Sequence, residues 1–252
     1  MMRNCMITGA SSGIGKAIAY AFAKNGDNVI ITGRRKDKLE QIKQDIESLY
    51  GVKVLVAVFD VTNCEEVLIH CQEILREVGQ IHVLINNAGL ALGLDAFQDY
   101  DLTDMLIMLD TNVKGLLTVT RQILPQMVKN DEGHIINIGS TAGIYAYAGA
   151  AVYAATKSAV KVLSDGIRID TIDKNIKVTT LQPGIVETDF SQVRFHGDQE
   201  RAATVYQGIE ALQADDIANC TLYIANQPRH VQISDMTIMA TKQATGFTIY
   251  RE

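Results

Sequence analysis

Two residues four positions apart, Tyr153 and Lys157, have side chains suited to moving a proton. On a helix, positions i and i+4 lie on the same side, so both side chains can contact one ligand. A tyrosine with its ordinary pKa of about 10 is a poor base, but an adjacent ammonium favours the phenolate. Ser140 lies upstream at the end of a predicted strand and can hydrogen-bond the same substrate oxygen as Tyr153. The alternative is an exposed pair whose side chains only cover apolar surface.

A glycine-rich turn, Thr8-Gly-Ala-Ser-Ser-Gly-Ile-Gly15, follows the first predicted strand. Where a strand turns sharply into a helix, free backbone N–H groups and the helix dipole attract an anion, and glycines let a pyrophosphate approach closely. The turn therefore predicts a dinucleotide site. A purely structural connection is the alternative, because the glycine spacing differs from G-x-G-x-x-G. The contacting residues would be Gly9, Ser11, Ser12, Gly13, Ile14 and Gly15.

The end of the second predicted strand indicates which dinucleotide binds. NAD-specific proteins place an Asp or Glu about 20 residues past the glycine-rich turn, where it binds the ribose 2′-hydroxyl. This chain has Gly33, Arg34 and Arg35 there, and guanidinium groups favour a 2′-phosphate. We therefore predict NADP. The alternative is two solvated arginines at a helix start, although cations are unfavourable next to that end of the dipole.

Seven short apolar runs alternate with helical patterns and would position these residues. Their continuous hydrophobicity indicates strands buried on both faces of a parallel sheet. The alternation predicts an α/β fold with a doubly wound, seven-stranded sheet and helices on both faces. The runs are Cys5 to Thr8, Asn28 to Thr32, Val52 to Phe59, His82 to Asn86, His134 to Ile138, Lys177 to Leu181 and Met236 to Met239. The longest helix is predicted from Val152 to Lys174, and the irregular stretch 188–208 indicates a mobile lid.

Composition and charge limit the classes of function. The 252 residues are 47% apolar and 21% charged, which favours one globular domain over residues 1–252. A net charge of −6, with scattered Lys and Arg, argues against nucleic acid as a partner. Polar residues interrupt every apolar run before the ~18 to 20 residues that span a bilayer, so we expect no membrane insertion. The five histidines have no metal-ligand spacing. The lack of a secretory signal and of Cys-x-x-Cys pairs predicts a cytoplasmic protein.

Further motifs follow the glycine-rich turn in order along nearly the whole chain. They are Asp60-Val61, Asn86-Asn87-Ala88-Gly89, Asn112, Ser140, Tyr153-Ala-Ala-Thr-Lys157 and Pro183-Gly184. Together they resemble the short-chain dehydrogenases/reductases, which implies a Rossmann-like fold, a nicotinamide cofactor and a Ser-Tyr-Lys-Asn catalytic set. The segments 138–143, 147–149 and 190–197 are similar to the branch of NADP-dependent 3-hydroxy-acid dehydrogenases. That branch acts on L-serine, L-allo-threonine and related acids, or reduces the matching semialdehydes.

The resemblance also implies roles for individual residues. Lys157 would bond the nicotinamide ribose, and Asn112 would anchor a water that relays protons to Lys157. The oxidised nicotinamide and the adjacent ammonium would both favour the Tyr153 phenolate and bring its proton transfer toward neutral pH. The alternative for Asn112 is a polar residue that bends its helix. Cofactor contacts would further include Asp60, Val61, Asn87, Ala88, Gly89, Tyr153, Lys157, Pro183, Gly184, Ile185, Val186 and Thr188. A homotetramer built on the long helices is expected by the same analogy.

Arg194 is the candidate for binding the carboxylate that distinguishes a 3-hydroxy acid from a plain alcohol. A planar guanidinium meets a carboxylate with two parallel bonds, and apolar neighbours would hydrate it poorly. The alternative is an ion pair that orders the loop. The acidic residues near it in sequence are Asp189, Asp198 and Glu200.

Three other functions compete with this interpretation. A 3-oxoacyl thioester reductase or a general carbonyl reductase would have the same cofactor half. A cofactor-binding sensor without turnover is a more remote alternative, because a fold does not dictate a function. In such a sensor we would expect one or more catalytic residues to be replaced, whereas Ser140, Tyr153 and Lys157 are all present.

Overall fold

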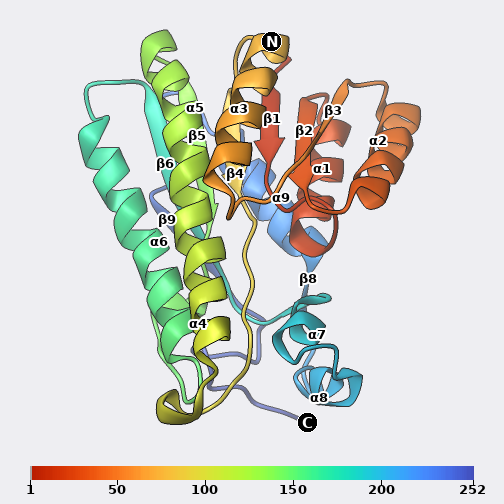
Figure 1. Ribbon diagram of the computed structural model, residues 1–252, viewed down its shortest axis with the longest axis vertical. Coiled ribbons are helices and arrows are strands. Elements are labelled where there is room, and N and C mark those ends of the chain that lie inside the picture. The colour runs from red at the N-terminus through yellow and green to blue at the C-terminus, as the bar shows by residue number, and fades with distance from the viewer. Residues whose placement is uncertain (1) are drawn as a thin grey trace.

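The computed structural model describes residues 2–252 and centres on a parallel, seven-stranded sheet (Figure 1). The strand order is β3-β2-β1-β4-β5-β6-β9. The strands are Asn4–Ile7 (β1), Asn28–Gly33 (β2), Val54–Val58 (β3), Val83–Asn86 (β4), Gly133–Ile138 (β5), Ile176–Pro183 (β6) and Asp235–Ile238 (β9). β4 and β5 are buried at every position, as continuous apolar runs predict. The winding of the sheet reverses between β1 and β4, which is where such folds bind ligands. The predicted doubly wound sheet is confirmed.

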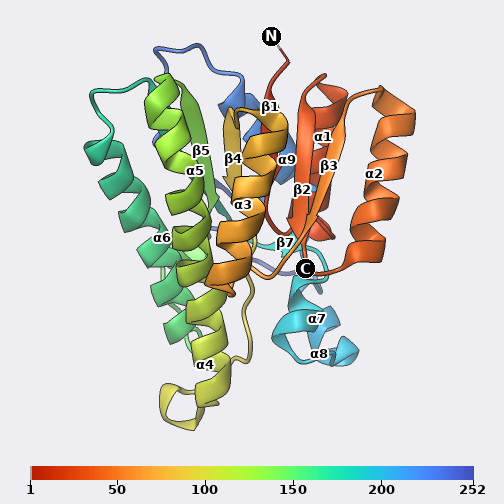
Figure 2. The same ribbon diagram turned by 45° about the horizontal axis from the view of Figure 1, so that its top comes forward.

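Helices cover both faces of this sheet (Figures 1 and 2). On one face α1, α2 and α9 enclose a core with β1 and β2, and on the other α3, α5 and α6 enclose a second core. The helices are Gly13–Lys24 (α1), Lys36–Tyr50 (α2), Cys64–Val78 (α3), Leu102–Leu109 (α4), Leu116–Asn130 (α5), Ala151–Asp170 (α6), Phe190–Arg194 (α7), Gln199–Thr204 (α8) and Ala214–Ala225 (α9). None of the helices described is long and apolar enough to cross a membrane.

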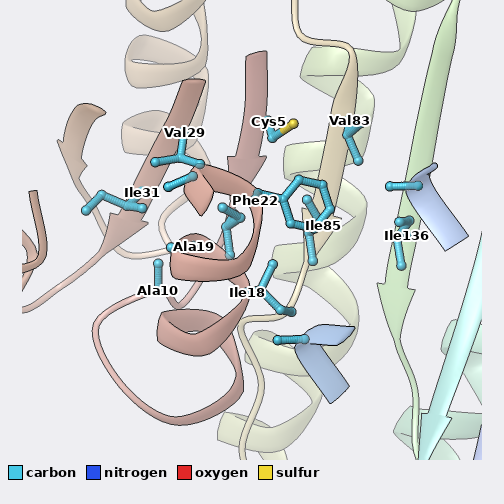
Figure 3. Packing of buried hydrophobic residues seen from close by; sticks show 14 of the residues in the cluster. Cys5, Ala10, Ile18, Ala19, Phe22, Val29, Ile31, Val83, Ile85 and Ile136 are labelled. Carbon is cyan, nitrogen blue, oxygen red and sulfur yellow. The ribbon is translucent and has the colours of Figure 1, made fainter. Parts of the chain in front are cut away.

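The helix that follows the glycine-rich turn is held by its apolar face. Figure 3 shows Ile18 and Phe22 of α1 beside Ile85 of β4, and all three side chains are fully buried. Burying one such side chain stabilises the fold by roughly 1.5–3 kcal/mol. The N-terminus of α1 is therefore fixed at the carboxyl edge of the sheet.

The structure corrects two expectations about secondary structure. α6 ends at Asp170 rather than Lys174, because the backbone of Thr171 leaves the helical region (φ −115°, ψ 19°) and a turn follows. A second, two-stranded parallel sheet pairs Val186–Glu187 (β7) with Leu212–Gln213 (β8). Strands of two residues are too short to carry a periodicity, so the sequence did not indicate them.

Residues 188–208 fold into α7 and α8, which lie below the carboxyl edge of the sheet in Figure 1. The hydroxyl of Tyr206 forms a hydrogen bond of 2.7 Å with the Ser191 hydroxyl and donates to the Thr188 carbonyl at 3.3 Å. We call residues 188–208 the cap; Tyr206, which follows α8, ties the end of this segment to α7.

Candidate active site

A cleft of about 390 Å³ is lined by the segments that follow the first six strands of the central sheet. Most of the predicted site residues line it. These are Gly9, Ser11, Ser12, Gly13, Ile14, Arg34, Arg35, Asp60, Val61, Asn87, Ala88, Gly89, Ser140, Tyr153, Lys157, Pro183, Gly184, Val186 and Thr188. Four predicted residues, Gly15, Asn112, Ile185 and Arg194, lie outside this lining. The topology therefore brings segments far apart in sequence to one cavity.

The glycine-rich turn is fitted closely against the end of β4. Gly9 has a φ of +67°, and a Cβ there would lie 2.9 Å from the Ala88 Cα, so only glycine fits without displacing backbone. The Asn87 amide donates to the carbonyls of Thr8 and Gly9 at 2.9 and 3.2 Å. Gly15 lies behind the turn, where a Cβ would be 2.4 Å from the Asn87 amide nitrogen. Gly15 thus allows the glycine-rich turn to pack closely against the end of β4.

The first turn of α1 presents free backbone donors to the cleft. Ser12 is the N-cap residue, yet its side chain makes no capping bond, and the first turn carries no acidic residue. The unpaired N–H groups at a helix start and the positive end of the dipole suit a pyrophosphate.

The two arginines after β2 occupy the predicted place. Arg35 donates to the hydroxyls of Ser11 (3.0 and 2.8 Å) and Ser12 (2.6 Å), and Arg34 forms an ion pair with Asp60 at 3.4 Å. The Arg34 side chain is 71% exposed, so it remains open to an anion. The cluster of two guanidiniums and two hydroxyls is a suitable donor set for a phosphate.

Ser140, Tyr153 and Lys157 meet at the carboxyl end of β5. The Ser140 hydroxyl accepts from the Ala142 amide at 3.1 Å, which fixes the side chain at the edge of the cleft. Lys157 is buried, and its Nζ donates to the Ile138 carbonyl at 2.8 Å and lies 6.0 Å from the centroid of the Tyr153 ring. The alternative of an exposed Tyr–Lys pair is excluded, since both residues are buried.

Burial makes Tyr153 hard to ionise within the chain itself. Burial raises the pKa of Tyr153 to about 12, and Tyr147 also raises it, while Arg194 and the Ser140 hydroxyl lower it. Burial lowers the pKa of Lys157 to about 8. Within the chain, desolvation thus outweighs the groups that favour the phenolate, and the expected contribution of an oxidised nicotinamide stays a prediction.

Asn112 is buried in a π-helical turn, Asp110–Gly115, between α4 and α5. Its amide donates to the Leu90 carbonyl (2.8 Å) and the Thr156 hydroxyl (3.0 Å), and its oxygen accepts from the Leu90 amide at 2.8 Å. Asn112 thus ties the irregular helix to the segment after β4 and to the catalytic helix. π-Helical turns of this kind are frequent at functional sites.

Arg194 lies over the ring of Tyr153. Its Cζ is 5.2 Å from the ring centroids of both Tyr153 and Phe190, and one terminal nitrogen donates to the Tyr147 hydroxyl at 3.2 Å. Its Nε is buried without a partner. Among the described residues Arg194 forms no ion pair, so the expected alternative of pairing with a nearby acidic residue is wrong. The acidic residues considered were Asp189, Asp198 and Glu200.

Sequence reasoning missed residues that support the cleft from behind. The Thr8 hydroxyl accepts from the amides of Asn87 and Ala88, both at 3.0 Å. The buried Gln243 accepts from the Ile185 amide at 2.9 Å, which explains why Ile185 does not line the cleft. Thr8, next to the glycine-rich turn, could have been singled out, whereas Gln243 carries no local signal. The described residues contain no cluster of metal-ligating side chains.

Comparisons with known proteins agree with this geometry. The family model described as short chain dehydrogenase matches residues 3–199. A probable NADP-dependent dehydrogenase from Haemophilus influenzae is 43% identical, over 98% of this chain and 97% of the relative. An NADP-dependent 3-hydroxy acid dehydrogenase from Schizosaccharomyces pombe is 39% identical, over 99% and 97%. A closed-form serine dehydrogenase structure complexed with NADP⁺ superposes with a TM-score of 0.89 and 38% identity, covering 99% of this chain and all of that one.

Proposed function

This chain belongs to the short-chain dehydrogenase family, and we propose that it is an NADP-dependent oxidoreductase acting on a small 3-hydroxy acid. L-Serine and L-allo-threonine are candidate substrates for oxidation at the β-carbon, and the matching semialdehydes for reduction. The observation that carries the proposal is Arg194, a guanidinium with a buried, unpartnered Nε held 5.2 Å from the ring of Tyr153.

The cleft fits NADP by its shape and its donors. Only glycine fits at position 9, which keeps the turn close to β4, and the first turn of α1 has free N–H groups for the pyrophosphate. Arg34 and Arg35, with the hydroxyls of Ser11 and Ser12, would hold the 2′-phosphate. When bound, the nicotinamide would accept or supply the hydride.

The catalytic residues would divide the remaining work among them. Ser140 holds the substrate oxygen, and Tyr153 takes its proton during oxidation or donates one during reduction. Lys157 bonds the nicotinamide ribose and stabilises the tyrosinate by its charge. Asn112 holds the Leu90 backbone and Thr156 in place. Its oxygen and the Lys157 Nζ both flank Gly89, which supports the proposed water relay between them.

Arg194 would bind the substrate carboxylate from the cap over residues 188–208. A bidentate guanidinium–carboxylate contact sets the distance between the carboxylate and the carbon that reacts at Tyr153. The buried Nε supplies one of the two donors that such a contact needs. We regard residues 1–252 as one domain that carries this cap as its lid.

An initial-rate comparison tests the proposal. L-Serine, 3-hydroxypropionate, 3-hydroxyisobutyrate and an acetoacetyl thioester are each assayed with NADP and with NAD. We expect turnover of 3-hydroxy acids with NADP. A rate with the thioester alone would favour a 3-oxoacyl thioester reductase, and no turnover of any substrate would favour a sensor.

We also propose a cytoplasmic homotetramer built on the long helices. The outer faces of α4, α5 and α6 carry exposed apolar side chains that self-association would cover. They include Leu106, Leu109, Leu117, Val162 and Ile169. Light scattering of the purified protein should give four times the mass of the 27.6 kDa chain.

A further inference from the structure

Two cations lie near the ring of Tyr153, and they come from different parts of the fold. Lys157 belongs to the same helix, and its Nζ is 6.0 Å from the ring centroid and already donates to the Ile138 carbonyl. Arg194 comes from α7 in the cap, and its Cζ is closer, at 5.2 Å. Of these two cations, the one carried by the cap is closer to the centre of the Tyr153 ring.

Arg194 is held in this position by several contacts. Its guanidinium lies against the Phe190 ring and donates to the Tyr147 hydroxyl. Its backbone carbonyl accepts from the Gly93 amide at 2.8 Å, which joins α7 to the segment after β4. A guanidinium stays protonated throughout the working pH range, so this charge is constant.

We propose that Arg194 also controls the protonation of Tyr153: alone it favours the tyrosinate, and once it binds a substrate carboxylate it returns Tyr153 to the neutral phenol. This proposal rests on the proposed function, because it assigns a regulatory role to the same carboxylate contact. An opposite charge within ~4–6 Å favours the ionised form of a group, and a counter-ion on that charge removes the effect.

Among the groups around Tyr153, Arg194 is the one that can change the protonation of the tyrosine when a carboxylate binds. Ser140 at the end of β5 and Arg194 on α7 both lower the pKa of Tyr153, whereas burial and Tyr147 raise it. Lys157 is on the same helix, and Asp189 lines the same cleft. Arg194 is thus the cation closest to the ring whose charge a bound ligand can neutralise.

The expected consequence concerns the direction of the reaction. With a bound semialdehyde carboxylate, Tyr153 stays protonated and can give its proton to the aldehyde oxygen while the carbon accepts a hydride from the reduced nicotinamide. A neutral alcohol leaves the charge of Arg194 uncompensated and keeps Tyr153 closer to its base form. The site is therefore set to reduce carboxylated aldehydes near neutral pH and to oxidise neutral alcohols at lower pH than 3-hydroxy acids.

The first part of the proposal is that Arg194 alone favours the tyrosinate. The pH dependence of kcat/KM for oxidation of a neutral β-hydroxy ester tests it, because this profile reports the ionisation of the free enzyme and the ester brings no carboxylate. In Arg194→Met the rising limb should move to higher pH by roughly one unit or more. Arg194→Lys should stay near the wild-type midpoint. The matched control is Arg201→Met, which removes a cap arginine that stacks on Phe195 at 4.4 Å, and it should leave the midpoint unchanged.

The second part, that a bound carboxylate returns Tyr153 to the neutral phenol, is tested with the wild-type protein. The midpoint of kcat for oxidation should be higher with the 3-hydroxy acid than with its ester, and this difference should vanish in Arg194→Met. An unmoved midpoint for the ester in Arg194→Met, or an equal shift in Arg194→Lys, would overturn the inference. If Arg194 did not bind the carboxylate, the ester profile would still shift while acid and ester shared one kcat midpoint, which separates the two failures.

Discussion

The side chain of Asn112 and the backbone of Leu90 exchange two hydrogen bonds, each 2.8 Å long. The amide thereby pairs with the N–H and the C=O of one residue, as a residue of a neighbouring antiparallel strand would, although it comes from a π-helical turn. Through its third bond, to Thr156, the same amide reaches the helix that carries Tyr153 and Lys157. Asn112 therefore fixes the distance between the segment after β4 and α6.

Replacing Asn112 should cost both stability and turnover. Asn112→Ala leaves the Leu90 amide and carbonyl unpaired, so we expect the free energy of unfolding to fall by about 1–3 kcal/mol and kcat to fall with it. Asn112→Asp keeps an acceptor for the Leu90 amide but sets a buried carboxylate against the Leu90 carbonyl, so it should lose at least as much stability. Urea unfolding and steady-state kinetics measure the two effects. Asn130→Ala, at the exposed end of α5, is the control, and an equal loss there would contradict the assignment.

Cofactor preference should depend on the end of β2. Gly33→Asp combined with Arg34→Ala places a carboxylate where it repels a 2′-phosphate and accepts from a free 2′-hydroxyl. A Cβ at Gly33 would meet only ordinary contacts, the nearest being the Ser11 hydroxyl at 3.5 Å, so the fold should tolerate the change. We expect the ratio of kcat/KM for NADP over NAD to reverse. Lys38→Ala, an exposed charge on α2, should leave the ratio unchanged. Equal values for the two cofactors in the wild-type protein would refute the role of the arginines.

Substitutions of Tyr153 and Lys157 should affect turnover and NADP affinity differently. Tyr153→Phe removes only the proton-transfer group, so turnover should fall by about 10²–10⁴-fold while NADP affinity stays nearly intact. Lys157→Ala should weaken both, because the lysine would contact the cofactor as well as the tyrosine. Fluorescence titration with NADPH and initial rates give the two quantities. The exposed Tyr145 provides the control Tyr145→Phe, and substantial activity left in Tyr153→Phe would assign the proton to another group.

Acid sensitivity should originate partly at His134 in β5. Burial lowers the pKa of His134 from 6.5 to about 3, so below pH 6.5 the unfolded chain binds a proton that the folded protein does not. This part of the stability is complete above about pH 6.5 and is lost as the pH falls toward 3, by at most about 1.4 kcal/mol per unit. The stability advantage of the wild type over His134→Asn should shrink between pH 6.5 and 4.5 in urea titrations. His230→Asn, at an exposed position, should run parallel to wild type throughout. A constant difference between wild type and His134→Asn would contradict the assignment.

The fold was predictable because continuous apolar strands and a glycine-rich turn are local patterns. The contacts of Asn112, Gln243 and Arg194 were not, because each joins segments that only tertiary structure brings together. The effect of burial on Tyr153 was not predictable for a related reason. Sequence spacing reveals the nearby Lys157, whereas the burial that raises the pKa of Tyr153 arises only from tertiary packing.

Substrate discrimination should depend on Arg194 and, more weakly, on Tyr147. Arg194→Met removes a charge-assisted contact of about 1.5–3 kcal/mol, so kcat/KM for serine should fall by roughly one to two orders of magnitude relative to a neutral β-hydroxy ester. The ratio of kcat/KM for the two substrates is measured on the high-pH plateau of each profile, where a change in the ionisation of Tyr153 does not contribute. Tyr147→Phe loses only the 3.2 Å bond that orients the guanidinium and should move the ratio in the same direction by less. If both substrates lose activity equally in Arg194→Met, the arginine orders the cap and the carboxylate binds elsewhere.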